Sequence, residues 1–471
     1  MLAAGIALSM TACGNKDYGH HEKGVANTDT SQTQFAIMGA QSALSPGYDD
    51  NVVLNQLQED AGISIEWTTM SESLAEQVNI RIAGDELPDA FMGVGFSNYD
   101  ISRYGDDGTF IDLTPYLTEE YMPNLSKILE ENPDIRSAIT MDDGYIYGLP
   151  AGERMGTAGI GAAEDFYAGF GFTNWPNDVC NDLVLRSDGT VEFMCVTDQY
   201  RQALTYFHDW YAEGLMDVEM FSQSDTQLIS KCSQGYVGVS TWWYIEELMG
   251  DYAEDYVFLP ILDGPDGTHN VTIRTGGGIN SGQLNITKAC KSPANLLKFY
   301  DMWYAPEIVM QLHYGPIGTY FTGQDEDGVW LSISNEESLE KYGKGSGELK
   351  GECEVAGPKL ILSDYYQTTF RMEDRAIERL TDLYDFWMPY VDDTSTYPVD
   401  CVFTGRELDD IDWYKANFES AVSEQEGLWI KNGGPTDEEW EAYIEHLRDK
   451  CGMDKLLAVY QNAYNRYSGK E

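Results

Sequence analysis

The chain has 471 residues, 42% of them hydrophobic and 13% aromatic. That length predicts two or three domains, and the apolar content excludes a chain that is disordered throughout. Its 79 acidic and 29 basic side chains give a formal net charge of −50, which repels nucleic-acid phosphates and anionic membrane surfaces and opposes self-association. We therefore expect a monomer without a nucleic-acid partner.

The N-terminal segment predicts export and a lipid anchor. Residues 1–12 are apolar and uncharged, and small residues precede Cys13. A run this short cannot cross a bilayer, which takes about 20 apolar residues, but it fits the hydrophobic part of a signal peptide. The small residues before Cys13 resemble the lipobox of bacterial lipoproteins, although Met10 stands where leucine is usual. We interpret residues 1–12 as a signal-peptide remnant and residues 13–34 as a lipidated cysteine with a flexible tether. The alternative is a buried N-terminal strand with an incidental cysteine.

The other cysteines predict little cross-linking. Eight cysteines occur, and setting Cys13 aside leaves an odd number that cannot all pair within the chain. Cys180 and Cys195 flank a hairpin pattern around Asp188 and Gly189, so they are candidates for one disulfide, with unpaired thiols as the alternative. No C-x-x-C motif occurs, and we expect no metal and no cofactor.

The first folded segment alternates strands and helices. Strand patterns cover residues 35–39, 63–67 and 87–92, and helical spacing covers residues 51–61 and 73–83. A glycine follows each of these helices, as is common at helix C-termini. This β-α-β-α-β order predicts a parallel sheet with right-handed crossovers.

Further along, short strands and helices are mixed. The patterns predict a turn and strand at 140–152, a hairpin at 182–194, a helix at 198–213, a strand at 236–240, a helix from Ser292, and two C-terminal helices that meet at Gly452. Residues 140–152 combine a turn, a short strand and the glycine and proline that end it. This pattern is typical of a segment that crosses between two lobes.

Six short motifs carry a family resemblance through their order. They are Leu87–Ala90, Gly144–Pro150, Glu213–Asp217, Tyr314–Gly318, Phe403–Gly405 and the helix pair between Trp440 and Tyr467. Together they resemble the extracellular solute-binding proteins of family 1, especially the large lipoprotein group with oligosaccharide ligands. The similarity covers most of residues 35–468.

The resemblance implies an α/β, type II periplasmic-binding-protein-like fold of two lobes, with the hinge crossed several times. It implies a first lobe of residues 35–149 and 275–335 and a second lobe of residues 150–274 and 336–471, which close on a ligand between them. One departure concerns the second lobe, where the family usually has a helix and loop after the first crossing. Here about one helix and its loop are missing.

Aromatic side chains are candidates for sugar platforms, because the C–H face of a sugar packs on a flat apolar ring. Trp242 and Trp243 follow a predicted strand end, where ligands bind in open α/β sheets. By family position, Trp175 is a second platform. Tyr314, Tyr320 and Trp387 lie near predicted crossings or turns. For each the alternative is a place in a core.

Four polar residues are candidates for binding sugar hydroxyls. Glu153 and Arg154 follow the first crossing, and Arg274 precedes a run of three glycines at the second. Asp89 lies in a strand region of the first lobe. The alternatives are a surface salt bridge for the first three and a helix cap for Asp89.

Catalytic signals are poor. No G-x-S-x-G, H-E-x-x-H or P-loop motif occurs, and Asp325–Gly328 predicts a solvated turn rather than a calcium loop. We therefore predict a binding protein and not an enzyme: a lipid-anchored protein on the extracellular face of the membrane that captures a carbohydrate, in particular an oligosaccharide, by lobe closure. It would deliver that ligand to the membrane permease of an ABC importer. The alternatives are a secreted carbohydrate-active enzyme, a surface binding protein without transport, and a peptide or acidic sugar as cargo.

Overall fold

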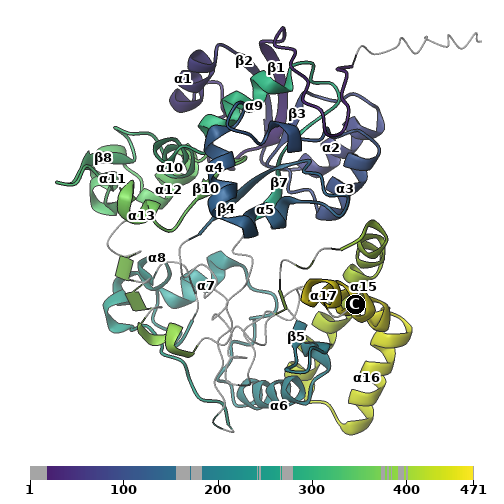
Figure 1. Ribbon diagram of the computed structural model, residues 1–471. Helices are drawn as coiled ribbons and strands as arrows, with labels where there is room; N and C mark the ends of the chain where they lie inside the picture. Colours follow the sequence, from purple (N-terminus) through teal and green to yellow (C-terminus); the bar gives the residue numbers. More distant parts are fainter. Residues whose placement is uncertain are drawn as a thin grey trace, which may run out of the picture.

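The computed structural model has two lobes, the first standing above the second in Figure 1. The structure describes residues 18–154, 170, 183–240, 242, 245–265, 267, 279–372, 377–378, 381–382, 385–390, 397–398, 401 and 403–469. Cys180 lies outside these residues, so its disulfide with Cys195 stays a prediction. In the described part of the chain, no helix combines the length and the apolar character needed to cross a membrane.

A six-stranded sheet organises the first lobe. Its order is β10 (Leu360–Ile361), β4 (Leu149–Glu153), β7 (Asn280–Ile286), β3 (Ala90–Met92), β1 (Gln34–Ala40) and β2 (Ser64–Met70). β7 runs antiparallel to both of its neighbours, and the other pairs are parallel. The parallel pairing of β1, β2 and β3 confirms the β-α-β-α-β prediction.

Helices cover both faces of this sheet, since alternate strand residues enter different cores. Ile37 of β1 lies in one apolar cluster and Met38 in another, and Phe91 of β3 shares the cluster of Met38. Strands buried on both faces are typical of parallel α/β sheets. The helices are α1 (Val52–Ala61), α2 (Leu74–Ala83), α3 (Asn98–Asp106), α4 (Pro123–Glu131), α5 (Pro133–Ile139), α9 (Pro293–Met302) and α10 (Pro306–Tyr314), with a 3-10 turn η1 (Thr114–Tyr116).

The first lobe extends further along the chain than predicted. After α10 come β8 (Phe321–Gln324), β9 (Trp330–Ser332), α11 (Asn335–Tyr342), α12 (Ser346–Cys353), β10, α13 (Tyr365–Thr368) and β11 (Phe370–Arg371). Leu360 and Ile361 pair with the outer edge of β4, and β11 joins β8 and β9 in a three-stranded sheet. The predicted return to the second lobe at residue 336 is therefore wrong, because residues 336–372 complete sheets of the first lobe.

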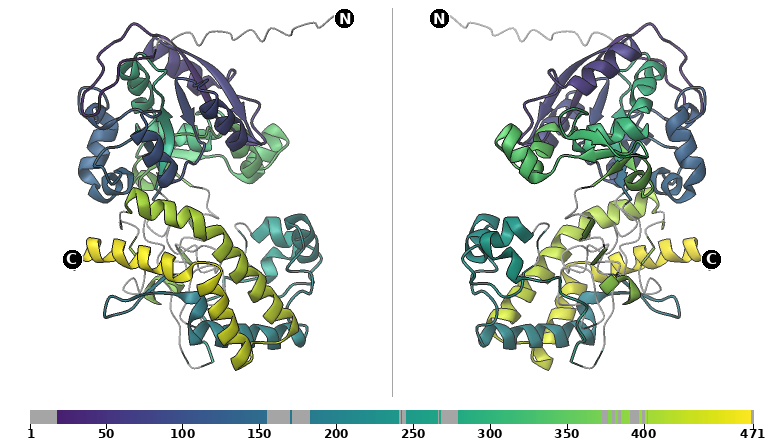
Figure 2. Two further views of the ribbon diagram at one scale, coloured as in Figure 1. Left: turned by 90° about the vertical axis from the view of Figure 1, so that its right-hand side faces the viewer. Right: turned by 90° about the vertical axis from the view of Figure 1, so that its left-hand side faces the viewer.

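Helices dominate the second lobe. It contains β5 (Leu183–Leu185), β6 (Val191–Phe193), η4 (Met194–Val196), α6 (Asp198–Ala212), α7 (Asp225–Cys232), α8 (Ile245–Met249), η5 (Gly250–Asp255), η6 (Met388–Tyr390), α15 (Gly405–Asn432), α16 (Asp437–Asp449) and α17 (Met453–Ser468). The strand predicted at 236–240 does not form, and Tyr236 and Val239 are exposed there. Figure 2 shows α15 rising from the second lobe toward the first.

The segment predicted as a flexible tether packs on the first lobe wherever the structure describes it. From residue 18 to residue 33 its groups bond to several elements of that lobe, as when the N–H of Gly24 donates to Asp112 Oδ2 (2.7 Å). The prediction of a free tether is thus wrong for these residues.

Candidate functional site

The candidate site lies at the carboxyl edge of the parallel strands. β1 ends at Ala40, β3 at Met92 and β4 at Glu153. Ligands of open α/β sheets bind outside the carboxyl ends of strands. A hollow of about 480 Å³ lies beside this edge, along α5 and the loop that follows it.

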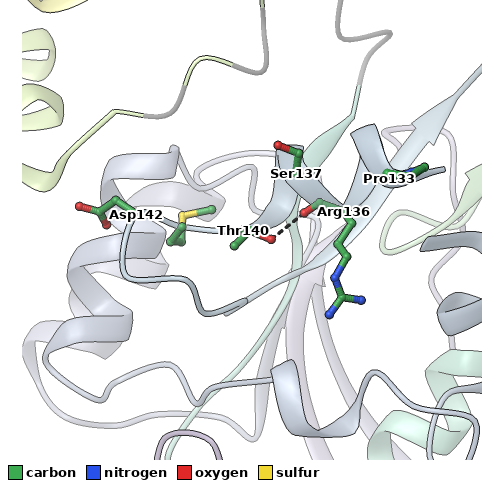
Figure 3. A pocket seen from close by; sticks show the side chains of 6 residues that line it. Pro133, Arg136, Ser137, Thr140 and Asp142 are labelled. Atoms are coloured by element: carbon green, nitrogen blue, oxygen red, sulfur yellow. Dashed lines mark hydrogen bonds between the residues drawn. The ribbon is translucent and has the colours of Figure 1, made fainter. Parts of the chain in front are cut away.

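Local sequence explains why α5 presents a polar face to the hollow. Ile135 and Ile139, four residues apart, are fully buried in the core of the first lobe. The opposite side of the helix carries the polar groups. The hollow is lined by Pro133, Arg136, Ser137, Thr140, Met141 and Asp142 (Figure 3).

Arg136 stands out among these lining residues. Within the described part of the chain, its guanidinium makes no hydrogen bond or ion pair, although acids outnumber bases 79 to 29. In Figure 3 it extends away from the carboxylate of Asp142. Its planar fork of N–H donors suits adjacent hydroxyls or a carboxylate. The hollow therefore offers a cationic donor at one end and an anionic acceptor at the other.

Asp142 also joins the two lobes. Its Oδ2 accepts a hydrogen bond from the backbone N–H of Gly405 at the start of α15 (3.0 Å). Its Oδ1 lies 3.4 Å from the hydroxyl of Ser102. The hollow is thus bounded at one end by a contact that spans the lobes.

Glu153 and Arg154, both predicted site residues, reach the same edge but have protein partners. Arg154 forms an ion pair with Asp134 of α5. Glu153 Oε1 accepts hydrogen bonds from the hydroxyls of Tyr314 (2.9 Å) and Tyr366. The structure therefore brings two predicted residues, Glu153 and Tyr314, into one hydrogen-bonded network, whereas Arg154 pairs separately with Asp134.

A cluster of partly buried charged side chains packs beside Glu153. His313 Nε2 lies 3.6 Å from Glu153 Oε2 and 3.2 Å from Lys350 Nζ, and His313 Nδ1 lies 3.3 Å from Glu354 Oε1. Lys359 forms an ion pair with Glu354 at 3.0 Å. Because an ammonium only donates, Nε2 accepts from Lys350, which places the ring proton on Nδ1 facing Glu354.

The pKa values of this cluster follow from burial and charge. Burial lowers the pKa of His313, so the imidazole is neutral near pH 7. Burial alone would raise the pKa of Glu153, but His313, the Tyr366 hydroxyl and Lys350 hold it below its usual value. Burial acts the same way on Glu354, and the hydrogen bond from His313 and the charge of Lys359 hold its pKa well below the usual range.

Tyr314 and Tyr320 do not form sugar platforms. They are 8% and 5% exposed, and their rings stack on each other with centroids 5.7 Å apart. Phe321 and Phe370 cover Tyr314 from other sides. Both tyrosines belong to the apolar core of the three-stranded sheet, so the predicted stacking role is wrong.

In the second lobe, the two described tryptophan candidates differ. Trp387 is 9% exposed, its Nε1 donates to the carbonyl of Leu259 (3.0 Å), and its ring packs edge-on against Phe258. It is a core residue, and the prediction of ligand contact is wrong. Trp242 is half-buried against a small cluster formed by Cys232, Leu248 and Met249. It remains a candidate platform.

Asp89 lies at the opposite edge of the sheet. It precedes the amino end of β3, where its Oδ2 accepts from the N–H of Ala36 (2.7 Å) and its Oδ1 from Gln32 Nε2 (2.8 Å). The prediction that it meets ligand is wrong, because it instead holds the N-terminal segment. Four other candidates, Trp175, Trp243, Arg274 and Cys13, lie outside the described residues.

Sequence reasoning missed Arg136, Ser137 and Asp142. A signal was available for Ser137, which lies opposite the apolar pair Ile135 and Ile139 on the short helix, whereas Arg136 borders that apolar face. No comparable pattern marks Asp142, because its partner Gly405 is 263 residues away.

Comparison with known proteins shows which proteins this chain is similar to. No protein-family model matches the chain. It is 28% identical to the fructooligosaccharide ABC transporter substrate-binding protein FusA of Streptococcus pneumoniae serotype 4, over 100% of this chain and 98% of FusA. That alignment runs over 541 positions, more than the 471 residues here, so FusA carries additional segments.

Solved structures agree with this likeness. The S. pneumoniae FusA EF-hand mutant in complex with fructo-nystose superimposes with a TM-score of 0.80 and 26% identity, over 93% of this chain and 100% of that one. FusA in complex with kestose gives a TM-score of 0.79 over the same shares. A human-milk-oligosaccharide (HMO) binding solute-binding protein from Bifidobacterium longum infantis shares the fold, with a TM-score of 0.75 and 16% identity over 93% of this chain and 99% of that one. The chain is therefore a two-lobed solute-binding protein of the ABC transporter type, a binding protein and not an enzyme.

Proposed function

We propose that the protein captures a short fructose-containing oligosaccharide outside the cell and delivers it to the permease of an ABC importer. The observation that carries this is the full-length similarity to FusA, two structures of which hold kestose and fructo-nystose. The hollow supports it chemically, since sugar hydroxyls need both donors and acceptors. Arg136 supplies donors, Asp142 an acceptor, and Ser137 and Thr140 hydroxyls that do both.

Capture follows from the arrangement of the lobes. The hollow belongs to the first lobe, and α15 of the second lobe bonds to Asp142 at its rim. A ligand that contacts both lobes favours the closed arrangement by the difference in its affinity for the two states. Binding energy alone drives the movement, and no covalent bond in the ligand changes.

The location and anchoring of the protein form part of the proposal. The apolar segment 1–12 and the small residues before Cys13 support a cysteine-linked lipid on the extracellular face of the membrane. The net charge of −50 supports a monomer, because like-charged copies repel one another.

Isothermal titration calorimetry with kestose and nystose tests the ligand class, with maltotriose as a glucose-based comparison. We expect saturable binding of the fructooligosaccharides and a higher melting temperature in their presence. No binding to any fructooligosaccharide would overturn the ligand class. Chromatography after long incubation checks that the sugars are recovered intact, and cleavage would favour the enzyme alternative.

Arg136→Ala tests the hollow. Loss of a hydrogen bond from a charged group costs about 1.5–3 kcal/mol, so we expect affinity to fall roughly tenfold or more. Arg448→Ala is the matched control, since Arg448 lies on α16 with its side chain 56% exposed and a single 3.6 Å ion pair to Asp454. Equal affinities of the two variants would exclude the hollow from the binding site.

A further inference from the structure

The loop after α5, which borders the hollow, is a tight turn. The N–H of Gly144 donates to the carbonyl of Met141 (2.9 Å), and the N–H of Met141 donates to the carbonyl of Tyr145 (2.9 Å). Gly144 has a φ of 83°, a backbone conformation that favours glycine. Two consecutive carboxylates, Asp142 and Asp143, lie in this turn, and each has its own partners.

Asp142 contacts the second lobe, whereas Asp143 contacts the N-terminal segment. Asp142 lines the hollow, and its Oδ2 accepts from the N–H of Gly405. Asp143 Oδ2 lies 3.0 Å from Lys23 Nζ and also accepts a hydrogen bond from the hydroxyl of Tyr147. Asp143 Oδ1 accepts from the backbone N–H two residues further on (3.0 Å). The contacts of Asp143 therefore hold the turn in which its neighbour meets the other lobe.

Lys23 joins two carboxylates of the first lobe. Its Nζ lies 3.0 Å from Asp143 Oδ2 and 3.3 Å from Oδ1 of Asp106, the last residue of α3. It also lies above the rings of Tyr145 (5.4 Å) and Tyr147 (5.1 Å). A cation shared by two carboxylates and two aromatic faces is held more firmly than one in a simple surface pair. Without it, the two carboxylates would repel each other and push the turn away from α3.

The pKa shifts show that both members of the pair are charged at neutral pH. Burial alone would lower the pKa of Lys23, but its contacts with Tyr147 and Asp143 raise that pKa above its usual range. Burial would raise the pKa of Asp143, but hydrogen bonds from Tyr147, from the N–H of Tyr145 and from Lys23 lower it below its usual value. The attraction between the two groups is therefore present wherever the protein works near pH 7.

The backbone on either side of Lys23 is fastened to the first lobe. Lys23 lies in a turn at residues 22–25, which a backbone hydrogen bond of 3.1 Å closes. Before the turn, His21 Nε2 lies 2.8 Å from a backbone carbonyl oxygen of the lobe. Within the turn, the N–H of Gly24 donates to Asp112 Oδ2 (2.7 Å). Because these contacts fix the backbone, the ammonium of Lys23 reaches the two carboxylates from a fixed point.

We propose that Lys23 is a positioning residue of the oligosaccharide site, because it holds the turn in which Asp142 meets both the hollow and Gly405 of the second lobe. This rests on the function proposed above. Lys23 acts through Asp143, the neighbour of Asp142, and not by contact with the sugar. The N-terminal segment is then a part of the binding apparatus and not only a connection to it.

The amide of Gly405 tests the position of the turn without any ligand. Its N–H donates to Asp142, so a displaced turn leaves it open to hydrogen exchange. We expect this amide to exchange several-fold faster in Lys23→Met than in the parent, and at the parent rate in Lys23→Arg, which keeps the charge. Lys127→Met is the matched control, since Lys127 on α4 has a side chain 74% exposed and lies 4.0 Å from Glu131. Equal exchange in Lys23→Met and the parent would overturn the proposal.

Calorimetry with kestose and nystose tests whether the turn matters for the sugar. We expect Lys23→Met to weaken binding by roughly threefold to tenfold, and Lys23→Arg to retain most of the affinity. In a chain that already carries Asp142→Ala, Lys23→Met should have little further effect, because the side chain through which it acts is gone. Losses that multiply in the double variant would show that Lys23 acts elsewhere, which contradicts the positioning role.

The outcomes separate this inference from the ligand class. If the parent binds no fructooligosaccharide, the proposed function fails, while exchange at Gly405 still tests whether Lys23 holds the turn. If the parent binds, faster exchange at unchanged affinity would show that the turn does not govern binding, and the positioning role is wrong. A loss of stability in urea with unchanged exchange and affinity would assign Lys23 to the fold alone.

Discussion

The carboxylate of Asp142 in the first lobe accepts a hydrogen bond from the N–H of Gly405 in the second, with the two atoms 3.0 Å apart. Gly405 is the first residue of the 28-residue helix α15, whose cap residue Thr404 uses its own side chain for the N–H of Glu407. The N–H groups at a helix start lack partners within the helix and carry partial positive charge. Asp142 thus stabilises the point where α15 meets the other lobe.

Asp142→Ala is expected to loosen this contact and to weaken oligosaccharide binding. An exposed hydrogen bond to a charged group contributes about 1–2 kcal/mol, which corresponds to roughly a tenfold loss of affinity if the bond holds the lobes ready to close. Calorimetry measures the affinity, and small-angle scattering measures the spread of lobe separations without ligand. Glu445→Ala, an exposed acid on α16, is the control, and equal affinity of the two variants would contradict a role for Asp142.

The cluster around His313 predicts that acid destabilises the protein. The pKa of His313 is lowered from 6.5, so below that pH the unfolded chain takes up a proton that the folded chain refuses. The stability that neutral His313 contributes is therefore fully present above pH 6.5. It is lost as the pH falls below that value. Glu153 and Glu354, with pKa values lowered from 4.5, add a second loss as the pH falls below that value.

Urea unfolding at a series of pH values checks this. A single group changes the unfolding free energy by at most about 1.4 kcal/mol per pH unit, and His313→Gln should flatten the profile as the pH falls below about 6.5. His446→Gln, at an exposed histidine on α16, is the control substitution. A His313→Gln profile parallel to that of the parent would show that His313 does not titrate in this way.

Tyr366→Phe is expected to lower stability and leave ligand affinity unchanged. The substitution removes one of two hydroxyl donors to Glu153 Oε1, and only Tyr314 at 2.9 Å remains. Leaving a half-buried carboxylate short of one donor costs about 1–3 kcal/mol. Denaturant unfolding measures the loss, with Tyr342→Phe as the control. A drop in affinity at unchanged stability would instead assign Glu153 and Tyr366 to the ligand.

Local chemistry explains which parts of the fold could be predicted. Asn51 accepts from the N–H groups of Val53 and Leu54 to start α1, and Gly62 ends it at φ 68°. Both signals lie within a dozen residues, so pattern reasoning finds them. β10 has two residues, too few for any periodicity, and its pairing with β4 spans more than 200 positions. Local sequence patterns therefore could not predict that residues 336–372 still belong to the first lobe.

The site was harder to predict because composition does not separate core from surface. Tyr314, Tyr320 and Trp387 are aromatic residues near predicted turns, but Tyr314 and Tyr320 stack on each other and Trp387 packs against Phe258. Arg154 lies at the expected edge, since it directly follows the end of β4. Local sequence does not reveal which distant residue each side chain contacts. That contact decides whether the side chain can bind a ligand.

Of the tryptophan candidates that the structure describes, Trp242 is half-buried rather than enclosed in a core, and its substitution tests the cleft from the side of the second lobe. The ring is half-buried against the cluster of Cys232, Leu248 and Met249, which would hold it in one orientation. A sugar packed on a fixed aromatic face gains about 1–2 kcal/mol from buried C–H surface.

We therefore expect Trp242→Ala to weaken oligosaccharide binding by roughly tenfold, and Trp242→Phe to retain most of the affinity because it keeps a flat ring. Trp413→Ala is the matched control, since Trp413 lies on α15 with 75% of its surface exposed. Calorimetry gives the affinities, and ligand-induced quenching of tryptophan fluorescence should shrink in Trp242→Ala alone. Similar quenching in the parent and in Trp242→Ala would show that the ring does not meet the sugar, because a stacked indole reports directly on the group that covers it.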